Sequence, residues 1–165
     1  MFFIKYNRGD FFMSFYNRKL AVDYARKWAL SRNPTYYNYD KLGGDCTNFI
    51  SQCLYVGKRE MNYRGYGWYY HSANNKSASW TGVEFLYKFL LNNKYEGPRG
   101  TLIERDELEI GDIIQLSFDG VVFGHSLFVT EISGKKIKIC THTMDAKDRS
   151  FDSYNYKKAR FFHIK

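Results

Sequence analysis

The hydrophobic period of the chain changes near Leu108, and this change limits the possible folds more than any other feature. Before that point, apolar residues recur every three or four positions, which is the spacing of helices with one buried face. After it, short runs rich in β-branched and aromatic residues are separated by Asp-Gly and Ser-Gly turns, which is typical of strands. Helices that precede strands, rather than alternate with them, predict an α+β fold with an antiparallel sheet or small barrel.

Three helices are expected in the first part of the chain. The first begins at Asn17 and stops at an Asn-Pro pair, because proline cannot continue a helix. The second begins near Cys46, and Gly57 is a plausible end for it. Thr81 and Glu84 form a Thr-x-x-Glu capping box ahead of the third helix, which should end at an Asn-Asn pair.

Four strands are expected after a charged connection at residues 94–107. Their sequences are IGDIIQLSF, FGHSLFVTEI, KIKICTHT and ARFFHI. A chain of 165 residues is long enough for one hydrophobic core, and no repeat or linker interrupts it. Residues 16–165 are therefore predicted to form one domain, with residues 1–15 as an arm of unknown role.

The segment GGDCTNFISQCL places a cysteine at the start of the second helix. Asp45 is a favoured N-cap residue, so Cys46 should lie at or beside the first helical position. The unpaired N–H groups and the positive end of the helix dipole favour an anion there, which predicts an exposed thiolate with a lowered pKa. A nucleophile is one interpretation of Cys46, and a small buried residue is the other. Cys53 is expected in the core.

Composition limits the partners and the compartment. The net charge of +8 would attract polyanions, but no Lys/Arg run exceeds two residues and no nucleic-acid-binding motif occurs, so nucleic acid is not an expected partner. No apolar run reaches the length of a membrane span, and the first residues do not resemble a signal peptide. The chain as given is expected in the cytosol, or at the cell wall or outside the cell if it is a fragment of an exported protein. The oligomeric state is not predicted.

The three cysteines argue against a disulfide framework, since Cys46 and Cys53 lie too far apart along one helix to be bridged. Cys46, Cys140, His125 and His142 could also be imagined as zinc ligands. However, the close Cys-x-x-Cys pairs of structural zinc sites are missing. Neither a metal nor another cofactor is predicted.

A cysteine nucleophile needs a base, and His125 is the best placed of the four histidines. It opens a predicted strand, where its side chain can project from the sheet edge toward a helix end. His142 is the candidate for the group that orients this base. A hairpin that turns at Ser133-Gly134 places the two histidines opposite each other, and a turn at Gly134-Lys135 makes them diagonal neighbours on one face. In both of these registers the residue numbers of each cross-strand pair add up to an odd number. Only a register with an even sum would place the two histidines on opposite faces of the sheet.

Each of these assignments has an alternative. A histidine on a strand is commonly a structural residue, and Asp145 could replace His142 as the orienting group. An oxyanion hole would use the backbone N–H of Cys46 and one further donor. Tyr39 or Asp40 could lie near it, although a carboxyl group donates only when it is protonated.

Residues 63–80 form a long loop in which aromatic rings stand among small polar residues, a composition typical of a binding surface. Trp68 and Trp80 are therefore candidate substrate-binding residues, as are Asp40 and Asp45 beside the cysteine. The alternative is that the rings of the loop pack over the end of a helix.

Six segments together resemble the bacterial putative amidase domain family, from about Tyr16 to the C-terminus. In order, they are YNRKLAVDYARKWAL, GGDCTNFISQCL, SWTGVEFLYKFL, GDIIQLSF, GHSLFVT and THTMDAKDRSF. That family is similar to the CHAP and NlpC-type cysteine peptidases of the papain-like superfamily. The resemblance implies a papain-like fold with Cys46 as nucleophile, His125 as base and His142 as third residue.

Three functions follow from these observations. The first is hydrolysis of an amide bond in a peptide or a peptidoglycan stem peptide through a thioester on Cys46. The second is a non-catalytic module that holds glycan or peptide on the 63–80 loop. The third is a thiol acyltransferase, which would use the same residues and pass the acyl group to an amine.

Overall fold

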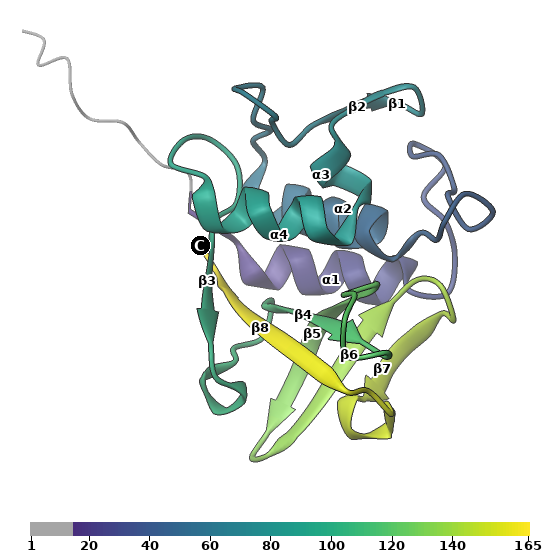
Figure 1. Cartoon of the computed structure of the whole chain (residues 1–165), viewed down its shortest axis with the longest axis vertical. Coiled ribbons are helices and arrows are strands. Elements are labelled where there is room, and N and C mark those ends of the chain that lie inside the picture. The colour runs from purple at the N-terminus through teal and green to yellow at the C-terminus, as the bar shows by residue number, and fades with distance from the viewer. Residues whose placement is uncertain (1–14) are drawn as a thin grey trace, which may run out of the picture.

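The computed structural model describes residues 15–165 (Figure 1), so the predicted arm lies outside this range except for its last residue. The helices are α1 (Arg18–Trp28), α2 (Cys46–Lys58), α3 (Ala78–Thr81) and α4 (Val83–Asn92), with short 3-10 helices at Arg105–Glu107 and Phe151–Ser153. The strands are β1 (Tyr70–Ser72), β2 (Asn75–Lys76), β3 (Gly100–Ile103), β4 (Ile113–Ser117), β5 (His125–Ser133), β6 (Lys136–Thr141), β7 (Ala146–Ser150) and β8 (Lys158–Ile164).

Six of the strands form one antiparallel sheet in the order β3-β8-β4-β5-β6-β7, and β1 and β2 form a separate hairpin. In Figure 1 the helices lie together on one side of the molecule and the sheet lies on the other. The fold is therefore α+β with an antiparallel sheet, as the change of period predicts. The four predicted strands correspond to β4, β5, β6 and β8.

The two edge strands of the sheet, β3 and β7, are not predicted from the sequence. β3 lies within the segment expected to be a connection, and β7 has the polar sequence AKDRS, of which only Ala146 is buried. An edge strand pairs on one side only and covers little of the core. Its sequence therefore needs no clear alternation of apolar and polar residues.

Each face of the sheet has its own hydrophobic cluster. Phe128 of β5 belongs to the cluster between the sheet and the helices, which also holds Phe49 of α2. Leu127 and Val129 belong to a second cluster, which includes Tyr154. Because side chains alternate along a strand, the start of β5 points even-numbered residues at the helices and odd-numbered residues at the second cluster.

The hairpin between β5 and β6 uses one of the two turns that the sequence allows. Ser133 pairs with Lys136, so the turn is Gly134-Lys135, with Gly134 at φ 57°. A positive φ at the first turn residue favours glycine there. From this turn alone, the two histidines would lie on one face.

A β-bulge at Thr130 reverses that expectation. It shifts the register between the two strands, so that Phe128 pairs with Cys140. The residue numbers of this pair add up to an even number, which is the register that places His125 and His142 on opposite faces of the sheet. The predicted contact between the two histidines is therefore wrong, because one extra residue in a strand exchanges its two faces.

The predicted capping box is also wrong. Thr81 is the last residue of α3, and Gly82 is the N-cap residue of α4. The Glu84 carboxylate instead pairs with Arg160 of β8 at 2.8 Å. A threonine that is itself helical does not have the extended conformation that capping requires.

Gly57 does not end α2, which continues to Lys58 and is followed by Arg59 in the left-handed conformation (φ 58°). A Cβ atom at Gly57 would lie 2.5 Å from the buried ring of Tyr16. The glycine therefore allows the segment before α1 to pack closely against α2.

We expect Gly57→Ala to lower the free energy of unfolding by about 1–3 kcal/mol, because the added methyl group forces the Tyr16 ring or α2 to move. Urea unfolding followed by circular dichroism measures the change. Gly124→Ala is the matched control, because a Cβ atom there meets nothing within 4 Å. Equal stability of Gly57→Ala and the parent chain would show that the packing of Tyr16 on α2 does not require a glycine at position 57.

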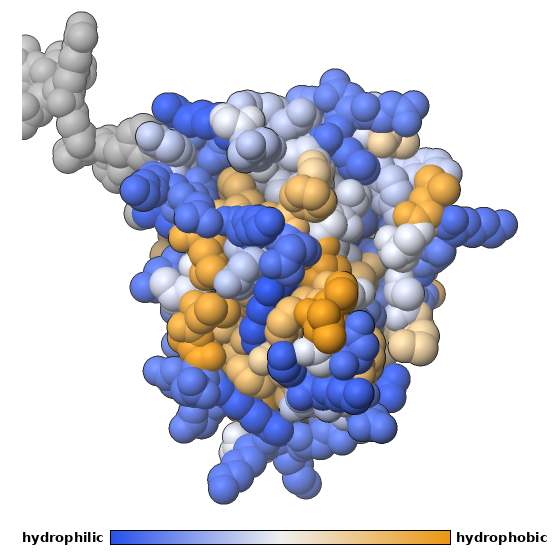
Figure 2. Space-filling model, viewed as in Figure 1, coloured by the Kyte–Doolittle hydropathy of each residue, from blue (hydrophilic) through white to orange (hydrophobic). Residues whose placement is uncertain are grey.

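Hydrophilic side chains cover most of the surface seen in Figure 2, with apolar side chains in smaller patches between them. Within residues 15–165, no helix has the length and apolar character needed to cross a lipid bilayer.

Candidate active site

Cys46 is the first residue of α2, as predicted, but only 6% of it is exposed. Its sulfur lies 3.8 Å from the hydroxyl group of Thr47, and the backbone N–H of Ser126 donates a hydrogen bond to it. The hydroxyl groups of Thr47 and Ser126 lie 3.1 Å apart. The start of α2 therefore lies against the start of β5, where His125 is the first residue.

Burial raises the pKa of the Cys46 thiol above its ordinary value, and the negative charge of Asp45 acts in the same direction. The hydrogen bonds from Ser126 and Thr47 lower this pKa but do not compensate for burial. The predicted exposed thiolate with a lowered pKa is thus wrong, because the loss of water around the sulfur outweighs the helix end. At neutral pH Cys46 is a thiol, and it needs a base to become a nucleophile.

Asp45 occupies the N-cap position of α2, but its carboxylate does not cap the helix. One carboxylate oxygen accepts hydrogen bonds from the backbone N–H of Tyr39 and the side-chain amide of Asn48. The other lies 2.6 Å from Nδ1 of His142, and the Asp45 N–H donates to the Thr143 hydroxyl. Asp45 is fully buried, so its tentative assignment as a substrate-binding residue is wrong.

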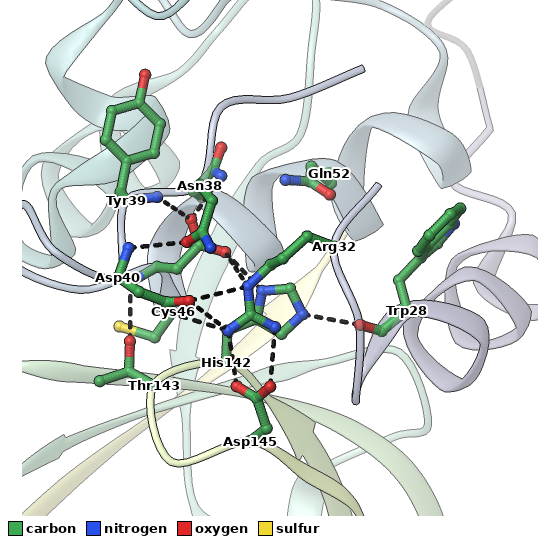
Figure 3. Close-up of polar contacts among 12 residues, drawn as sticks. Trp28, Arg32, Asn38, Tyr39, Asp40, Cys46, Gln52, His142, Thr143 and Asp145 are labelled. Atoms are coloured by element: carbon green, nitrogen blue, oxygen red, sulfur yellow. Dashed lines mark hydrogen bonds and ion pairs between the residues drawn. The ribbon is translucent and has the colours of Figure 1, made fainter. Parts of the chain in front are cut away.

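Both ring nitrogens of His142 have partners. Nδ1 faces the Asp45 carboxylate, and Nε2 lies 2.8 Å from the backbone carbonyl oxygen of Trp28, at the end of α1 (Figure 3). The ring also stacks on Phe49, with the ring centroids 4.1 Å apart. Carboxylate and carbonyl oxygens accept hydrogen bonds, so each ring nitrogen of His142 faces an acceptor. His142 therefore links Asp45 to α1.

His125 opens β5, as predicted, and is almost fully buried. Its ring centroid lies 6.1 Å from that of Phe118 and 6.2 Å from that of Tyr154, on the sheet face away from the helices. Its Nε2 atom has no hydrogen-bond partner among the described residues. Burial, and the positive charge of Arg149, lower the pKa of His125 from 6.5 to about 4. At neutral pH the ring is therefore uncharged and can accept a proton.

Because the folded chain resists protonation of His125, we expect this residue to make stability depend on pH. Above the ordinary pKa of 6.5, His125 is neutral in both states and has no effect. Between 6.5 and about 4 only the unfolded chain takes up the proton, so stability falls as the pH falls. Below about 4 the loss is complete, and it amounts to roughly 3 kcal/mol at 1.36 kcal/mol per pH unit.

Urea unfolding of the parent chain and of His125→Phe at pH 7 and pH 4 measures this dependence. The phenyl ring suits the aromatic surroundings and does not titrate, so the variant should lose less stability on acidification. Other titrating groups are common to both proteins and cancel in the comparison. Equal losses in the two proteins would show that His125 is not held in its neutral form.

Arg32 is a site residue that the sequence does not reveal. Its guanidinium donates hydrogen bonds to both oxygens of Asp40 and both oxygens of Asp145, and lies 3.5 Å from the Asp45 carboxylate (Figure 3). Arg32 thereby joins the segment after α1 to the loop before Cys46 and to the β6–β7 turn. Charge-assisted pairs with two carboxylates hold these three segments in one arrangement.

These contacts also limit the roles of three predicted residues. The Asp40 carboxylate accepts from Arg32, and the backbone N–H of Tyr39 donates to Asp45, so neither offers a free donor for an oxyanion. Asp145 pairs with Arg32 and has no hydrogen bond to a histidine. In this structure it does not orient His125.

Trp68 and Trp80 are fully buried, and their ring centroids lie 4.8 Å apart. Their indole N–H groups donate to the side chains of Ser51 and Asn48 on α2. Neither ring can reach a substrate, so the prediction that they bind one is wrong. For these two residues the alternative is confirmed, because they pack against a helix.

Cys46, Cys53 and Cys140 are all buried free thiols, and Cys53 lies in the core as predicted. No cluster of three or more His, Cys, Asp or Glu side chains in the described part of the chain could hold a metal ion.

A family model described as a putative amidase domain matches residues 15–165. The chain belongs to this family. The description of the putative amidase domain family points to an enzyme that hydrolyses amides in general. Over 161 residues the chain is 36% identical to the uncharacterized protein YhbB of Bacillus subtilis (strain 168), a match that covers 90% of this chain and 50% of that protein. The chain thus spans about half the length of this relative. No solved structure matches the chain.

Proposed function

We propose that this putative amidase domain has a papain-like fold and is a cysteine hydrolase that cleaves an amide bond in a peptide or a peptidoglycan stem peptide. One arrangement carries the proposal: a buried thiol at the start of α2 lies against the start of β5, whose first residue is an uncharged histidine with a buried Nε2 atom that lacks a partner among the described residues. Buried polar atoms without partners are rare in folded proteins, and they often mark functional sites.

In the proposed reaction, Cys46 attacks the carbonyl carbon of the amide while Nδ1 of His125 takes the proton from the thiol. The negative charge that develops on the carbonyl oxygen is stabilised by the backbone N–H of Cys46, at the start of α2. The His125 ring lies on the sheet face away from the helices, and no hydrogen bond joins it to Cys46 within residues 15–165. Substrate binding must therefore bring the Nδ1 edge of the ring and the sulfur together at the start of β5. Catalytic contacts are often longer in a free enzyme than in its substrate complex.

The tetrahedral intermediate then collapses as the C–N bond breaks, and His125 returns the proton to the departing amine. This leaves a thioester on Cys46. A water molecule, deprotonated by His125, attacks the thioester carbon, and the carboxylic acid leaves as the thiol is restored. His142 acts as a positioning residue in this scheme, because it holds Asp45, and with it the start of α2, against α1.

The thioester provides the direct test. The protein is incubated with peptide amides that release a fluorescent amine and with peptidoglycan fragments, and the reaction is quenched in acid. Mass spectrometry of the digested protein should find the acyl group on Cys46 and not on Cys53 or Cys140. Acylation of either of those cysteines, or release of amine without any acyl-cysteine and with full activity of Cys46→Ala, would reject the mechanism.

The same assay separates the two alternatives. If an added amine captures the acyl group faster than water does, the protein is an acyltransferase. If the Cys46→Ala chain and the parent chain bind the peptides equally and neither releases amine, the domain is a binding module. The raised pKa of the Cys46 thiol is the observation that favours the binding module.

A further inference from the structure

The two buried side-chain polar atoms that lack a hydrogen-bond partner in the described chain are Nε2 of His125 and the hydroxyl oxygen of Tyr154. They belong to neighbouring residues. The centroids of the two rings lie 6.2 Å apart, and the ring planes are inclined by 41°. Two polar atoms that each lack a partner satisfy each other when they meet, either directly or through one shared water molecule.

Tyr154 is held in place by its own surroundings. It directly follows the 3-10 helix Phe151–Ser153, and its backbone N–H donates to the carbonyl oxygen of Phe151. The Arg149 guanidinium lies 4.2 Å from the centroid of its ring, and Arg149 itself donates to the Ser153 hydroxyl. Tyr154 is thus a buried residue whose ring position is fixed. The Arg149 guanidinium is close enough to act as a donor toward its hydroxyl oxygen, but no hydrogen bond of ordinary geometry is formed, so the oxygen can still accept one.

The residue expected to orient His125 is engaged elsewhere. His142 lies on the other face of the sheet and uses both ring nitrogens for Asp45 and Trp28. Asp145 is bound by Arg32. On the face that His125 occupies, the neighbouring groups are the ring of Phe118, the ring and hydroxyl of Tyr154, and the charge of Arg149. Of these, only the tyrosine offers a hydrogen-bond acceptor.

We infer that Tyr154 is a positioning residue for His125, with its hydroxyl oxygen accepting a hydrogen bond from Nε2–H. The inference rests on the proposed function, in which His125 is the base. A hydrogen on Nε2 leaves the lone pair on Nδ1, which is the nitrogen that must accept the proton from Cys46. When Nδ1 is protonated, the bond to Tyr154 remains and stabilises the imidazolium. No proton is transferred to or from the tyrosine.

The experiment compares the parent chain with Tyr154→Phe, using nuclear magnetic resonance of the 15N-labelled full chain to read the tautomer of His125. Two-bond 15N–1H correlations distinguish a hydrogen on Nε2 from one on Nδ1. We expect the parent chain to show the Nε2–H form, and Tyr154→Phe to show a mixture of both forms. Removal of the acceptor should also shift the His125 titration to lower pH, because the imidazolium loses a partner.

The variant keeps the aromatic ring, and with it the contact with the Arg149 guanidinium, and removes a buried hydroxyl group that makes no hydrogen bond of ordinary geometry, so it should fold with little change in stability. Tyr156→Phe is the matched control, since the Tyr156 ring packs on Phe151 and does not contact His125. That variant should leave both the tautomer and the titration of His125 as they are in the parent chain.

Turnover gives the second measurement. If His125 is the base, Tyr154→Phe should lower kcat about tenfold with little change in KM, as expected for the loss of one hydrogen bond of roughly 1.4 kcal/mol. An unchanged tautomer and titration of His125 in Tyr154→Phe would overturn the inference, whatever the activity. An altered tautomer in a protein that cleaves no amide would support the Tyr154 contact and reject the proposed function.

Discussion

Cys46→Ala is expected to reduce amide turnover by about 10⁴-fold or more, because without the thiol no thioester can form. His125→Gln should reduce turnover by about 10²- to 10⁴-fold, since a glutamine amide cannot take the thiol proton. The double variant should be no slower than Cys46→Ala alone, because the two residues act in one step. Release of the fluorescent amine from peptide substrates measures all three variants.

Cys53→Ala is the matched control for the loss of a thiol. Cys53 lies on the same helix as Cys46 but is fully buried in the core, so its removal should lower stability and leave turnover intact at a temperature where the variant is folded. Effects of Cys46→Ala and His125→Gln that multiply in the double variant would contradict a shared step. Turnover lost equally in Cys53→Ala would point to a structural cause.

Removal of either partner of the buried Asp45–His142 pair is expected to lower the free energy of unfolding by about 3–5 kcal/mol. The pair is 2.6 Å long, and both side chains are 1% exposed. Asp45→Asn removes the carboxylate that faces Nδ1 of His142. His142→Ala removes the 2.6 Å partner of the buried carboxylate and also the contact with Trp28, and leaves Arg32 as the cation nearest to Asp45 at 3.5 Å. In each variant the remaining polar group loses its partner in a site where both side chains are 1% exposed.

The ion pair between Lys19 and Asp23 on α1 is the matched control. It has the same length of 2.6 Å, but its side chains are 84% and 54% exposed. Asp23→Ala should therefore change the free energy of unfolding by less than about 1 kcal/mol. If urea unfolding shows losses of similar size for Asp45→Asn and Asp23→Ala, the buried pair does not hold the start of α2.

Asp45→Asn has a second expected effect, on the thiol. The negative charge of Asp45 contributes to the raised pKa of Cys46, so its removal should lower this pKa. Alkylation of Cys46 by iodoacetamide at a series of pH values, with the labelled site assigned by mass spectrometry, measures the shift. The pH at which the alkylation rate of Cys46 reaches half its maximum should be lower in Asp45→Asn than in the parent chain, and unchanged in Asp23→Ala. A move to higher pH would contradict the electrostatic role of Asp45.

Local patterns in the sequence determined three of the helices (α1, α2 and α4), four of the strands (β4, β5, β6 and β8) and the places of two candidate residues. The stripe that begins at Asn17 is α1, and Asn17 caps that helix by accepting a hydrogen bond from the Leu20 N–H. Cys46 is the first residue of α2, and His125 is the first residue of β5. Helix starts, periodicity and strand runs depend on residues close in sequence, so the chain itself reveals them.

Tertiary structure decided how those residues meet. The bulge at Thr130 exchanged the faces of β5 and so separated His125 from His142, although the turn is one of the two that the sequence allowed. A bulge has no fixed sequence signature, and one extra residue reverses every side chain beyond it. Likewise, burial of the Cys46 sulfur depends on the contact of α2 with β5, which the helix sequence alone does not encode.

The sequence also did not reveal which residues the charged side chains contact. Arg32 meets Asp40 eight residues away but Asp145 across 113 residues, and Asp45 meets His142 across 97. Tyr154 reaches His125 only because the segment after β7 folds back over the far face of the sheet. Contacts of this kind arise from the packing of distant segments, and a pattern of nearby residues carries no information about them.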